Sequence, residues 1–327
     1  MDKDLFLNML RIDSTSGREA EFAAFLPRAL KTPGNTVERF DSPDAVNLLF
    51  KWGNPKLFFC THMDTVPPYI PPSEDGSIIR GRGSCDAKGQ IFSMFEACKE
   101  LENQGYTDFA LLLLSGEETG SFGAKAWTRE GMGGDTLVVG EPTDCKMVSA
   151  SKGTKSFGVK IFGRPCHSGY PELGESAIEK FNSFYNLLKA TEFPVDEELG
   201  QTTWNIGKLT SDNPQNILSP EVSFRLYFRT TFASDAFVQK FMAGLKDMEV
   251  TPYGGDSPLR YFTVDGLPKT TVSFGSDAPH LKGFARKAIC GPGSIAVAHT
   301  EKEQISLDDV QKAINQYITI YKKCALY

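Results

Sequence analysis

The chain has 327 residues, of which 40% are hydrophobic and 23% are charged, and its formal net charge is −6. This balance is typical of folded globular proteins, and the length suits about two domains, because single hydrophobic cores rarely grow past ~250–300 residues. The acidic balance, with Lys and Arg scattered rather than clustered, excludes the usual kind of nucleic-acid binder.

The N-terminal segment MDKDLFLNMLRIDSTS predicts an ordinary packed helix. Its charges interrupt every apolar stretch, so it has the pattern of neither a signal peptide nor a membrane anchor. Leu5, Phe6, Met9 and Leu10 recur at helical spacing. No apolar run approaches the roughly 18 residues that cross a bilayer. The seven cysteines form no CxxC pair, which is typical of reduced thiols, so we expect a cytoplasmic protein with no membrane partner.

Short, continuously apolar runs alternate with helical segments in the first half of the chain. Such runs are typical of strands buried on both faces of an α/β sheet, and functional residues in these sheets follow the strand ends. We predict strands at Val46–Phe50, Leu57–Thr61, Phe109–Leu114 and Thr136–Val139, and helices at Glu19–Leu30, Gly89–Asn103 and Gly123–Arg129.

The pattern changes near Lys152, where strands and helices follow one another as in an α+β unit. We therefore predict one α/β domain formed by residues 1–152 and 256–327, interrupted by an inserted α+β domain at residues 153–255. The elements expected here are strands at Ser156–Phe162, Thr202–Leu209 and Val222–Phe228 and helices at Ser176–Leu188 and Asp235–Leu245; further runs at Thr270–Phe274 and Lys287–Cys290 precede a closing helix at Leu307–Lys322.

A histidine and an aspartate follow the predicted strand Leu57–Thr61. Imidazole is a good zinc ligand, and Asp64, two residues after His62, can accept its second N–H and fix the ring. Taken alone, an H-x-D pair favours a structural histidine over a metal ligand. The glycine-rich turn GRGSCDAKG adds Asp86 just before a helix, either as a ligand brought close by the flexible backbone or as a plain helix N-cap.

Further acidic side chains follow the next two predicted strands. Glu117 and Glu118 are adjacent in SGEETG, where their mutual repulsion favours a cation beside one of them and a proton-accepting role for the other. A solvated pair in a loop is the alternative. Glu141 follows Thr136–Val139, and His299 comes after a loop near the C-terminus. Two histidines and three carboxylates together suit two zinc ions, each with a histidine and a terminal carboxylate and one carboxylate bridging.

Taken in order, the motifs THMDTVP, GRGSCDAKG, SGEETGSFGA, VGEPT, GSDAP and GPGSIAVAHT resemble those of the acetylornithine deacetylase, succinyl-diaminopimelate desuccinylase and aminoacylase family of zinc metallohydrolases. The resemblance spans nearly the whole chain and is strongest to the acetylornithine deacetylase branch. It implies a zinc-peptidase-like mixed sheet flanked by helices, with an inserted α+β lid domain that usually forms a homodimer. It also implies two zinc ions per chain, with cobalt or manganese as alternatives.

The resemblance implies a role for each matching residue. Asp86 would bridge the two metals, with His62 and Glu141 completing one site and Glu118 and His299 the other. Asp64 would orient His62, and Glu117 would be the general base.

In the inserted domain, the resemblance implies that His167 reaches across a dimer to stabilise the tetrahedral intermediate. Asn216 and Arg229 match residues that hold the substrate carboxylate, and Gly275 and Ser276 lie where the main chain lines that pocket. Between Tyr253 and Thr270 the chain is shorter than the family pattern, so the rim of that pocket is expected to differ.

The resemblance implies a metal-dependent hydrolase that cleaves the amide bond of an N-acetyl or N-succinyl amino acid of the ornithine, citrulline or lysine type, in arginine or lysine biosynthesis. A di- or tripeptidase or a carboxypeptidase of the same family is the alternative. A non-catalytic relative that only binds a ligand is a third hypothesis, which the complete set of expected ligands and the presence of Glu117 disfavour.

Overall fold

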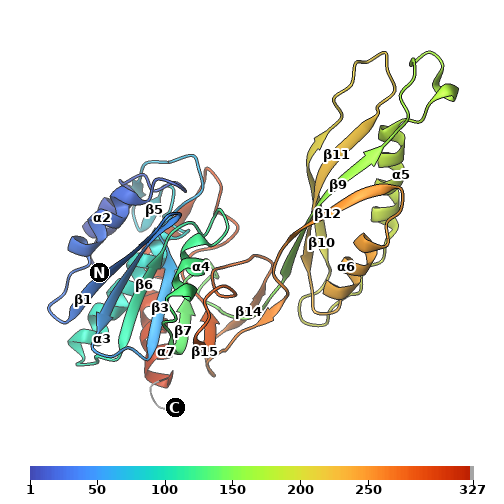
Figure 1. The fold of residues 1–327 in the computed structure, drawn as a ribbon. Coiled ribbons are helices and arrows are strands. Elements are labelled where there is room, and N and C mark those ends of the chain that lie inside the picture. The colour runs from blue at the N-terminus through green and yellow to red at the C-terminus, as the bar shows by residue number, and fades with distance from the viewer. Residues whose placement is uncertain (325–327) are drawn as a thin grey trace. The chain divides into compact units, whose positions relative to one another are not determined.

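Residues 1–324 are described by a computed structural model, in which the chain forms two compact units (Figure 1). The first comprises Met1–Ser149, Tyr261–Thr270 and the segment from Ser276 onward, and the second comprises Ala150–Arg260 and Thr271–Gly275. The predicted insertion at 153–255 falls within the second unit, which also takes in 150–152, 256–260 and 271–275. Its first residues belong there because Ala150 and Ser151 pair with the short strand Leu259–Arg260.

The first unit is built on a six-stranded mixed sheet. In order across the sheet the strands are β1 (Asn35–Ser42), β2 (Ala45–Trp52), β6 (Phe109–Leu114), β3 (Leu57–His62), β7 (Gly134–Val139) and β15 (Phe284–Ile289). Strands β6, β3, β7 and β15 are parallel neighbours, so their carboxyl ends meet at one edge, whereas β2 runs antiparallel to both of its neighbours, β1 and β6.

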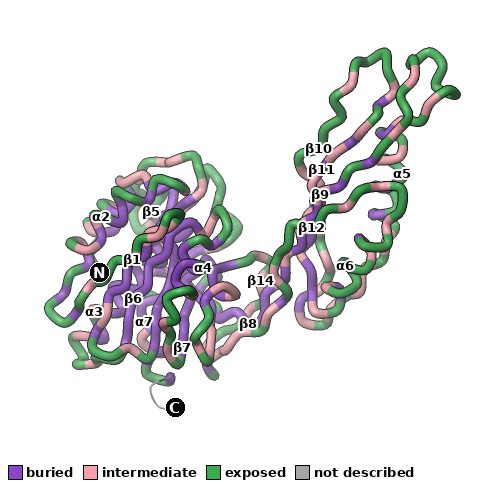
Figure 2. The backbone as a smooth tube through the Cα atoms, in the orientation of Figure 1, coloured by how far each residue is buried: buried purple, intermediate pink, exposed green. Residues whose placement is uncertain are grey.

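Helices cover both faces of this sheet. One face packs against α1 (Lys3–Leu10), α2 (Ala20–Ala29), α3 (Lys88–Asn103) and α7 (Leu307–Cys324), whose apolar side chains share a single core with alternate residues of the strands. Figure 2 shows that the strands of this sheet consist mostly of buried residues. The other face carries α4 (Phe122–Arg129), bound to β2 by a hydrogen bond from Asn47 Nδ2 to the Gly123 carbonyl. Each fully buried Leu or Phe contributes about 1.5–3 kcal/mol, which makes this core the main source of stability.

The second unit is an antiparallel sheet with helices on one face. Burial alternates along its central strands, which is the pattern of a sheet with one face packed and one face solvated. Its strands, in order, are β10 (Thr203–Thr210), β11 (Glu221–Thr230), β9 (Gly153–Phe162) and β12 (Met248–Gly254), and α5 (Ala177–Ala190) and α6 (Asp235–Ala243) pack with the buried face.

The predicted fold class, a mixed sheet flanked by helices, is confirmed, and every predicted helix is present within a few residues. Several strands without an apolar signature were not predicted. They are β1 and β12, the short sheet of β4 (Ser73–Asp75), β5 (Ile78–Arg80) and β16 (Gln304–Ser306), and β8 (Met147–Ser151) and β13 (Leu259–Arg260), which form a further sheet with β14 (Lys269–Val272). Among the described residues, no helix is both long and apolar enough to span a bilayer.

Candidate metal centre

Three parallel strands deliver the first ligand candidates to one edge of the sheet. His62 is the last residue of β3, Glu118 follows the end of β6, and Glu141 follows the end of β7. These strands are neighbours with matched register, so side chains that follow their carboxyl ends come together. The apolar runs visible in the sequence therefore bring the polar residues to one place.

Five of the predicted side chains form two groups that share Asp86. Within each group the candidate ligand atoms all lie within 4.8 Å of one another. The first group is His62, Asp86 and Glu141, and the second is Asp86, Glu118 and His299.

The carboxylate of Asp86 lies between two imidazoles. Its Oδ1 is 3.0 Å from His62 Nε2, and its Oδ2 is 3.3 Å from His299 Nε2. His299 Nε2 is in turn 2.9 Å from Glu118 Oε1. One carboxylate that presents each of its oxygens to a different histidine has the arrangement expected of a bridge between two cations.

Asp86 does not cap the helix that follows it. Helix α3 begins at Lys88, its N-cap position is Ala87, and no side chain makes a capping hydrogen bond there. The N-cap alternative for Asp86 is therefore wrong, because the side chain is directed to His62 and His299 instead.

The buried carboxylates of the cluster favour a bound cation. Burial, together with the neighbouring carboxylates of Asp86 and Glu117, raises the pKa of Glu141 well above its ordinary value, and Glu141 Oε1 is buried without a hydrogen-bond partner. Hydrogen bonds with Asp86 and Glu118 raise the pKa of His299 to about 10. Buried carboxylates with an unpartnered oxygen, beside imidazoles, fit a divalent metal with mixed nitrogen and oxygen ligands, such as zinc.

Asp64 fixes the ends of two strands. His62 Nδ1 lies 2.9 Å from the Asp64 carbonyl and 3.4 Å from Oδ1, which leaves Nε2 facing the cluster. The buried Asp64 carboxylate accepts the main-chain N–H groups of Glu117, at 3.0 Å, and Glu118, at 3.1 Å. Asp64 therefore joins the carboxyl ends of β3 and β6 and orients the residues that follow them.

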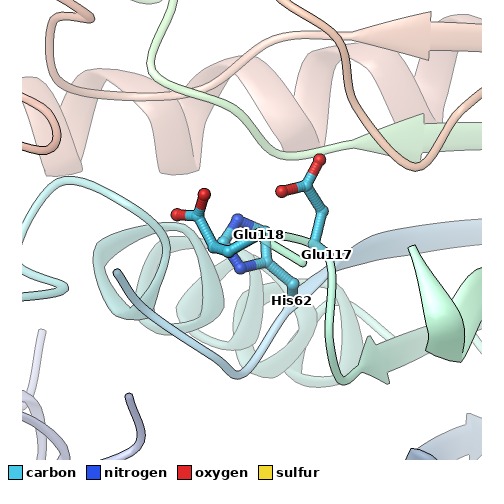
Figure 3. A group of neighbouring side chains, drawn as sticks. All are labelled: His62, Glu117 and Glu118. Carbon is cyan, nitrogen blue, oxygen red and sulfur yellow. The ribbon is translucent and has the colours of Figure 1, made fainter. Parts of the chain in front are cut away.

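Glu117 lies at the border of the cluster. It forms a third group with His62 and Glu118, again with ligand atoms within 4.8 Å, and in Figure 3 the two carboxylates lie on either side of the imidazole. Burial raises the pKa of Glu117 well above its ordinary value, a shift that a charged His62 opposes and Asp277 reinforces. A half-buried carboxylate with a raised pKa next to a metal site is well suited to accept a proton.

Comparison with known proteins decides the family. Residues 58–323 match the family described as Peptidase family M20/M25/M40. The chain belongs to this family. A peptidase M20 domain-containing protein of Schizosaccharomyces pombe is 31% identical and covers 96% of this chain and 82% of its own length. A probable carboxypeptidase of Aspergillus clavatus is 32% identical, with 97% and 87% covered.

Solved structures share the fold of this M20 protein. A tripeptidase from Staphylococcus aureus has a TM-score of 0.83 at 22% identity and covers 99% of this chain and 98% of its own. A dinuclear metal-binding peptidase of the M20 family from Bacillus subtilis has a TM-score of 0.67 at 13% identity, with 96% and 94% covered. The resemblance stated from the motifs is thus confirmed at the level of the M20 family, and the chain is a hydrolase that acts on linear amide bonds.

In the second unit of this M20 hydrolase, His167 and Asn216 lie on neighbouring segments. His167 forms a bridge with Ile217, and the Ser168 N–H donates to the Asn216 carbonyl at 2.9 Å. Both His167 and Asn216 are exposed. His167 Nδ1 accepts the Gly169 N–H at 3.1 Å, so Nε2 is the nitrogen left to meet a substrate.

Arg229 lies at the opposite end of the same sheet. Strand β11 begins at Glu221, just after the segment that holds Asn216, and Arg229 is its penultimate residue, which puts it about 25 Å from that end of the strand. One copy of the second unit therefore does not bring Asn216 and Arg229 to a single carboxylate. Gly275 is exposed at the end of the second unit, and Ser276, buried, is the first residue that returns to the first.

Three buried charged residues of this M20 chain were not predicted as part of the site. Asp277 is fully buried, neither of its carboxylate oxygens has a well-formed hydrogen bond, and burial raises its pKa to about 6. Arg82 and Glu303 form a buried ion pair next to Asp86, whose main-chain N–H donates to the Glu303 carboxylate. Arg82 lies in the motif GRGSCDAKG and Asp277 in GSDAP, which predicted other site residues. The only sequence signal for Glu303 is its position four residues after His299.

Proposed function

We propose that this chain is a two-zinc M20 peptidase that removes the C-terminal residue from short peptides. The observation that carries the proposal is the position of Asp86 between His62 and His299, with one further carboxylate beside each imidazole. Relatives at 30–32% identity named as probable carboxypeptidases, which match 95% or more of this chain, support a peptidase over the acetylornithine deacetylase branch that the motifs suggested.

His62, Asp86 and Glu141 would hold one metal, and Asp86, Glu118 and His299 the other; cobalt or manganese would suit the same ligands. Bound there, the metals would polarise the scissile carbonyl and lower the pKa of the attacking water. The donor set and the unpartnered oxygen of Glu141 support this assignment.

Glu117 would accept the proton of the attacking water and return it to the departing amine. The main-chain N–H of Glu117 donates a hydrogen bond to the Asp64 carboxylate, which supports this position of the residue. The pKa of Glu117 is raised toward neutral pH, where a carboxylate transfers protons most effectively in both directions. Asp64 would act on the reaction only through this positioning and through His62.

Arg229 would bind the substrate carboxylate with two parallel hydrogen bonds. Because Asn216 and His167 lie at the other end of the sheet, we propose that they come from the second copy of a homodimer. Exposed apolar residues on α5 support such a contact: Ile178 and Tyr185, two turns apart on one face, are 49% and 37% exposed, and Leu187 is 51% exposed.

A second candidate function, hydrolysis of an N-acylated amino acid, rests on the same chemistry. A peptide's last residue and an N-acyl amino acid both present an amide next to a free carboxylate, so the ligands, the base and Arg229 would serve either substrate. The two differ only on the acyl side of the bond.

A panel of matched substrates separates these functions. We expect zinc-loaded protein to hydrolyse N-acetyl-glycyl-alanine, which has a blocked N-terminus, and to lose at least about 100-fold in kcat/KM when the C-terminus is amidated, because Arg229 would then lack its partner. Turnover confined to N-acetyl-alanine and N-acetyl-ornithine would favour the second candidate. Turnover that requires a free N-terminal amine would instead indicate an aminopeptidase.

A further inference from the structure

One buried glutamate organises the turn that carries Asp86. Glu303 Oε1 accepts three main-chain N–H groups from this turn: that of Gly83 at 2.9 Å, of Cys85 at 3.1 Å and of Asp86 at 3.0 Å. The other oxygen, Oε2, lies 2.5 Å from Arg82 Nη1. Both side chains are almost completely buried, so the carboxylate and its donors form a network in the interior of the protein.

The same pair also holds the segment that carries His299. Glu303 follows His299 by four residues, and its carbonyl accepts the Gly81 N–H at 3.1 Å. Arg82 Nη1 donates to the Thr300 carbonyl at 3.3 Å, next to His299. The Arg82–Glu303 ion pair therefore joins the chain segments 81–86 and 299–303, because each of the two residues is hydrogen-bonded to the other's segment.

These two segments are the ones that need an anchor. His62 is the last residue of a buried parallel strand, Glu118 and Glu141 follow the ends of two others, and the sheet fixes their positions. Asp86 and His299 come instead from turns, and His299 has a positive φ of 64° and a half-exposed side chain. A turn held by one fully satisfied buried carboxylate is as restricted as a strand end, because any displacement would leave several buried donors unpaired.

We propose that Arg82 and Glu303 are positioning residues of the metal centre, which set the distance between the shared ligand Asp86 and the terminal ligand His299. The inference rests on the proposed function, since it requires that metals bind at these ligands. The two residues affect the two metal sites differently. Glu303 acts on both sites through Asp86. Arg82, which also contacts Thr300, acts more strongly on the site that contains His299.

The variant Glu303→Gln isolates the charge of the network. The side chain keeps its size, but an NH2 group replaces one of the two acceptor oxygens. This NH2 donor must then face other donors, either the Arg82 guanidinium or the three N–H groups of the turn. The matched control is Glu301→Gln, at an exposed position two residues away in the same segment. A second variant, Arg82→Lys, keeps the positive charge for Glu303 but loses donors to the Pro68 and Thr300 carbonyls.

The experiment measures zinc binding to metal-depleted protein by competition with a chromophoric chelator, together with folding by circular dichroism. We expect two binding constants for the wild type, both weakened about 10- to 100-fold in Glu303→Gln and unchanged in Glu301→Gln. In Arg82→Lys we expect one constant to weaken several-fold more than the other. Saturating zinc should restore most of kcat in each folded variant, which a general loss of structure would not allow.

Unchanged zinc constants in folded Glu303→Gln, or equal weakening of both constants in Arg82→Lys, would overturn the inference while leaving the proposed function intact. If Glu303→Gln does not fold, Arg82→Lys decides the matter alone through the same asymmetry. A wild type that binds no zinc would remove the proposed function itself, and the positioning role with it.

Discussion

The two units of this M20 hydrolase hold their candidate site residues in opposite ways. In the first unit His62, Asp64, Asp86 and Glu141 are buried, and the His62 imidazole contacts both aspartates. In the second unit His167 and Asn216 are exposed, on neighbouring segments joined by the hydrogen bond from the Ser168 N–H to the Asn216 carbonyl. Folding of one chain therefore brings the candidate metal ligands of the first unit together, whereas the side chains of His167 and Asn216 stay exposed.

This contrast separates two measurable quantities. Changes in the cluster of candidate ligands should alter how many metals bind or how tightly, because these side chains would contact the metals directly. Changes in the second unit should alter turnover while the metal content stays the same. Glu117 lies at the border of the cluster, so a variant of this residue tests whether it belongs with the groups that bind metal or with those that affect turnover alone.

The largest effect on turnover is expected for Glu117→Gln. The amide cannot accept a proton, so kcat should fall by about a thousandfold or more, while zinc content by atomic absorption stays at the wild-type value. Loss of zinc in this variant would instead make Glu117 a ligand, as its grouping with His62 and Glu118 also allows.

His167→Ala should lower kcat about 100- to 1,000-fold without changing zinc content, because one donor to the developing oxyanion is lost. Glu172→Gln, an exposed change in the same loop, is the matched control and should behave as wild type. Equal activity of His167→Ala and Glu172→Gln would remove His167 from the reaction.

Mixing two inactive variants tests whether His167 acts across a dimer. In a hybrid of Glu117→Gln and His167→Ala, one of the two sites regains both intact residues. Random reassortment of the mixture should therefore recover about a quarter of wild-type activity. No recovery, with hybrid formation verified by native mass spectrometry, would contradict the exchange of His167 between copies.

Zinc affinity should rise with pH across the neutral range. Hydrogen bonds to Asp86 and Glu118 raise the pKa of His299 to about 10 in the metal-free protein, so below that pH a proton must leave before the metal binds. We expect at least about a tenfold gain in affinity per pH unit from pH 6.5 to 8.5. An affinity that does not change over this range would argue against His299 as a ligand.

The smallest effect is expected for Arg229→Lys. Lysine keeps the charge but not the paired hydrogen bonds to a carboxylate, so KM should rise about tenfold with little change in zinc content. Arg225→Lys, in the same strand and with its guanidinium over the Tyr253 ring, is the control. Similar kinetics for both variants would place the substrate carboxylate elsewhere.

The sequence predicted the parallel strands that deliver the ligands because their residues are buried on both faces and form continuous apolar runs, as Phe109–Leu114 does. It did not predict β1, NTVERFDS, because an edge strand is paired on one side only and carries polar residues. It also missed β12, where Pro252 reads as a break although an edge strand tolerates it.

The five ligand candidates could be named from the sequence because each stands in a glycine-bordered motif or directly after a strand. Their mutual distances could not, since these depend on the sheet order and on turns such as the one around Asp86. Glu303 illustrates the limit: a single glutamate among charged neighbours has no local pattern, and its part in the network appears only when segments 81–86 and 299–303 are seen together.

The most direct measurement is the zinc stoichiometry of the wild type and of Asp86→Ala, after metal depletion, reconstitution and removal of loosely bound ions. We predict two zinc ions per wild-type chain and loss of tight binding at both sites in Asp86→Ala, because this carboxylate belongs to both ligand groups. A wild type that retains less than one zinc, or an Asp86→Ala variant that keeps two, would contradict a shared two-metal centre.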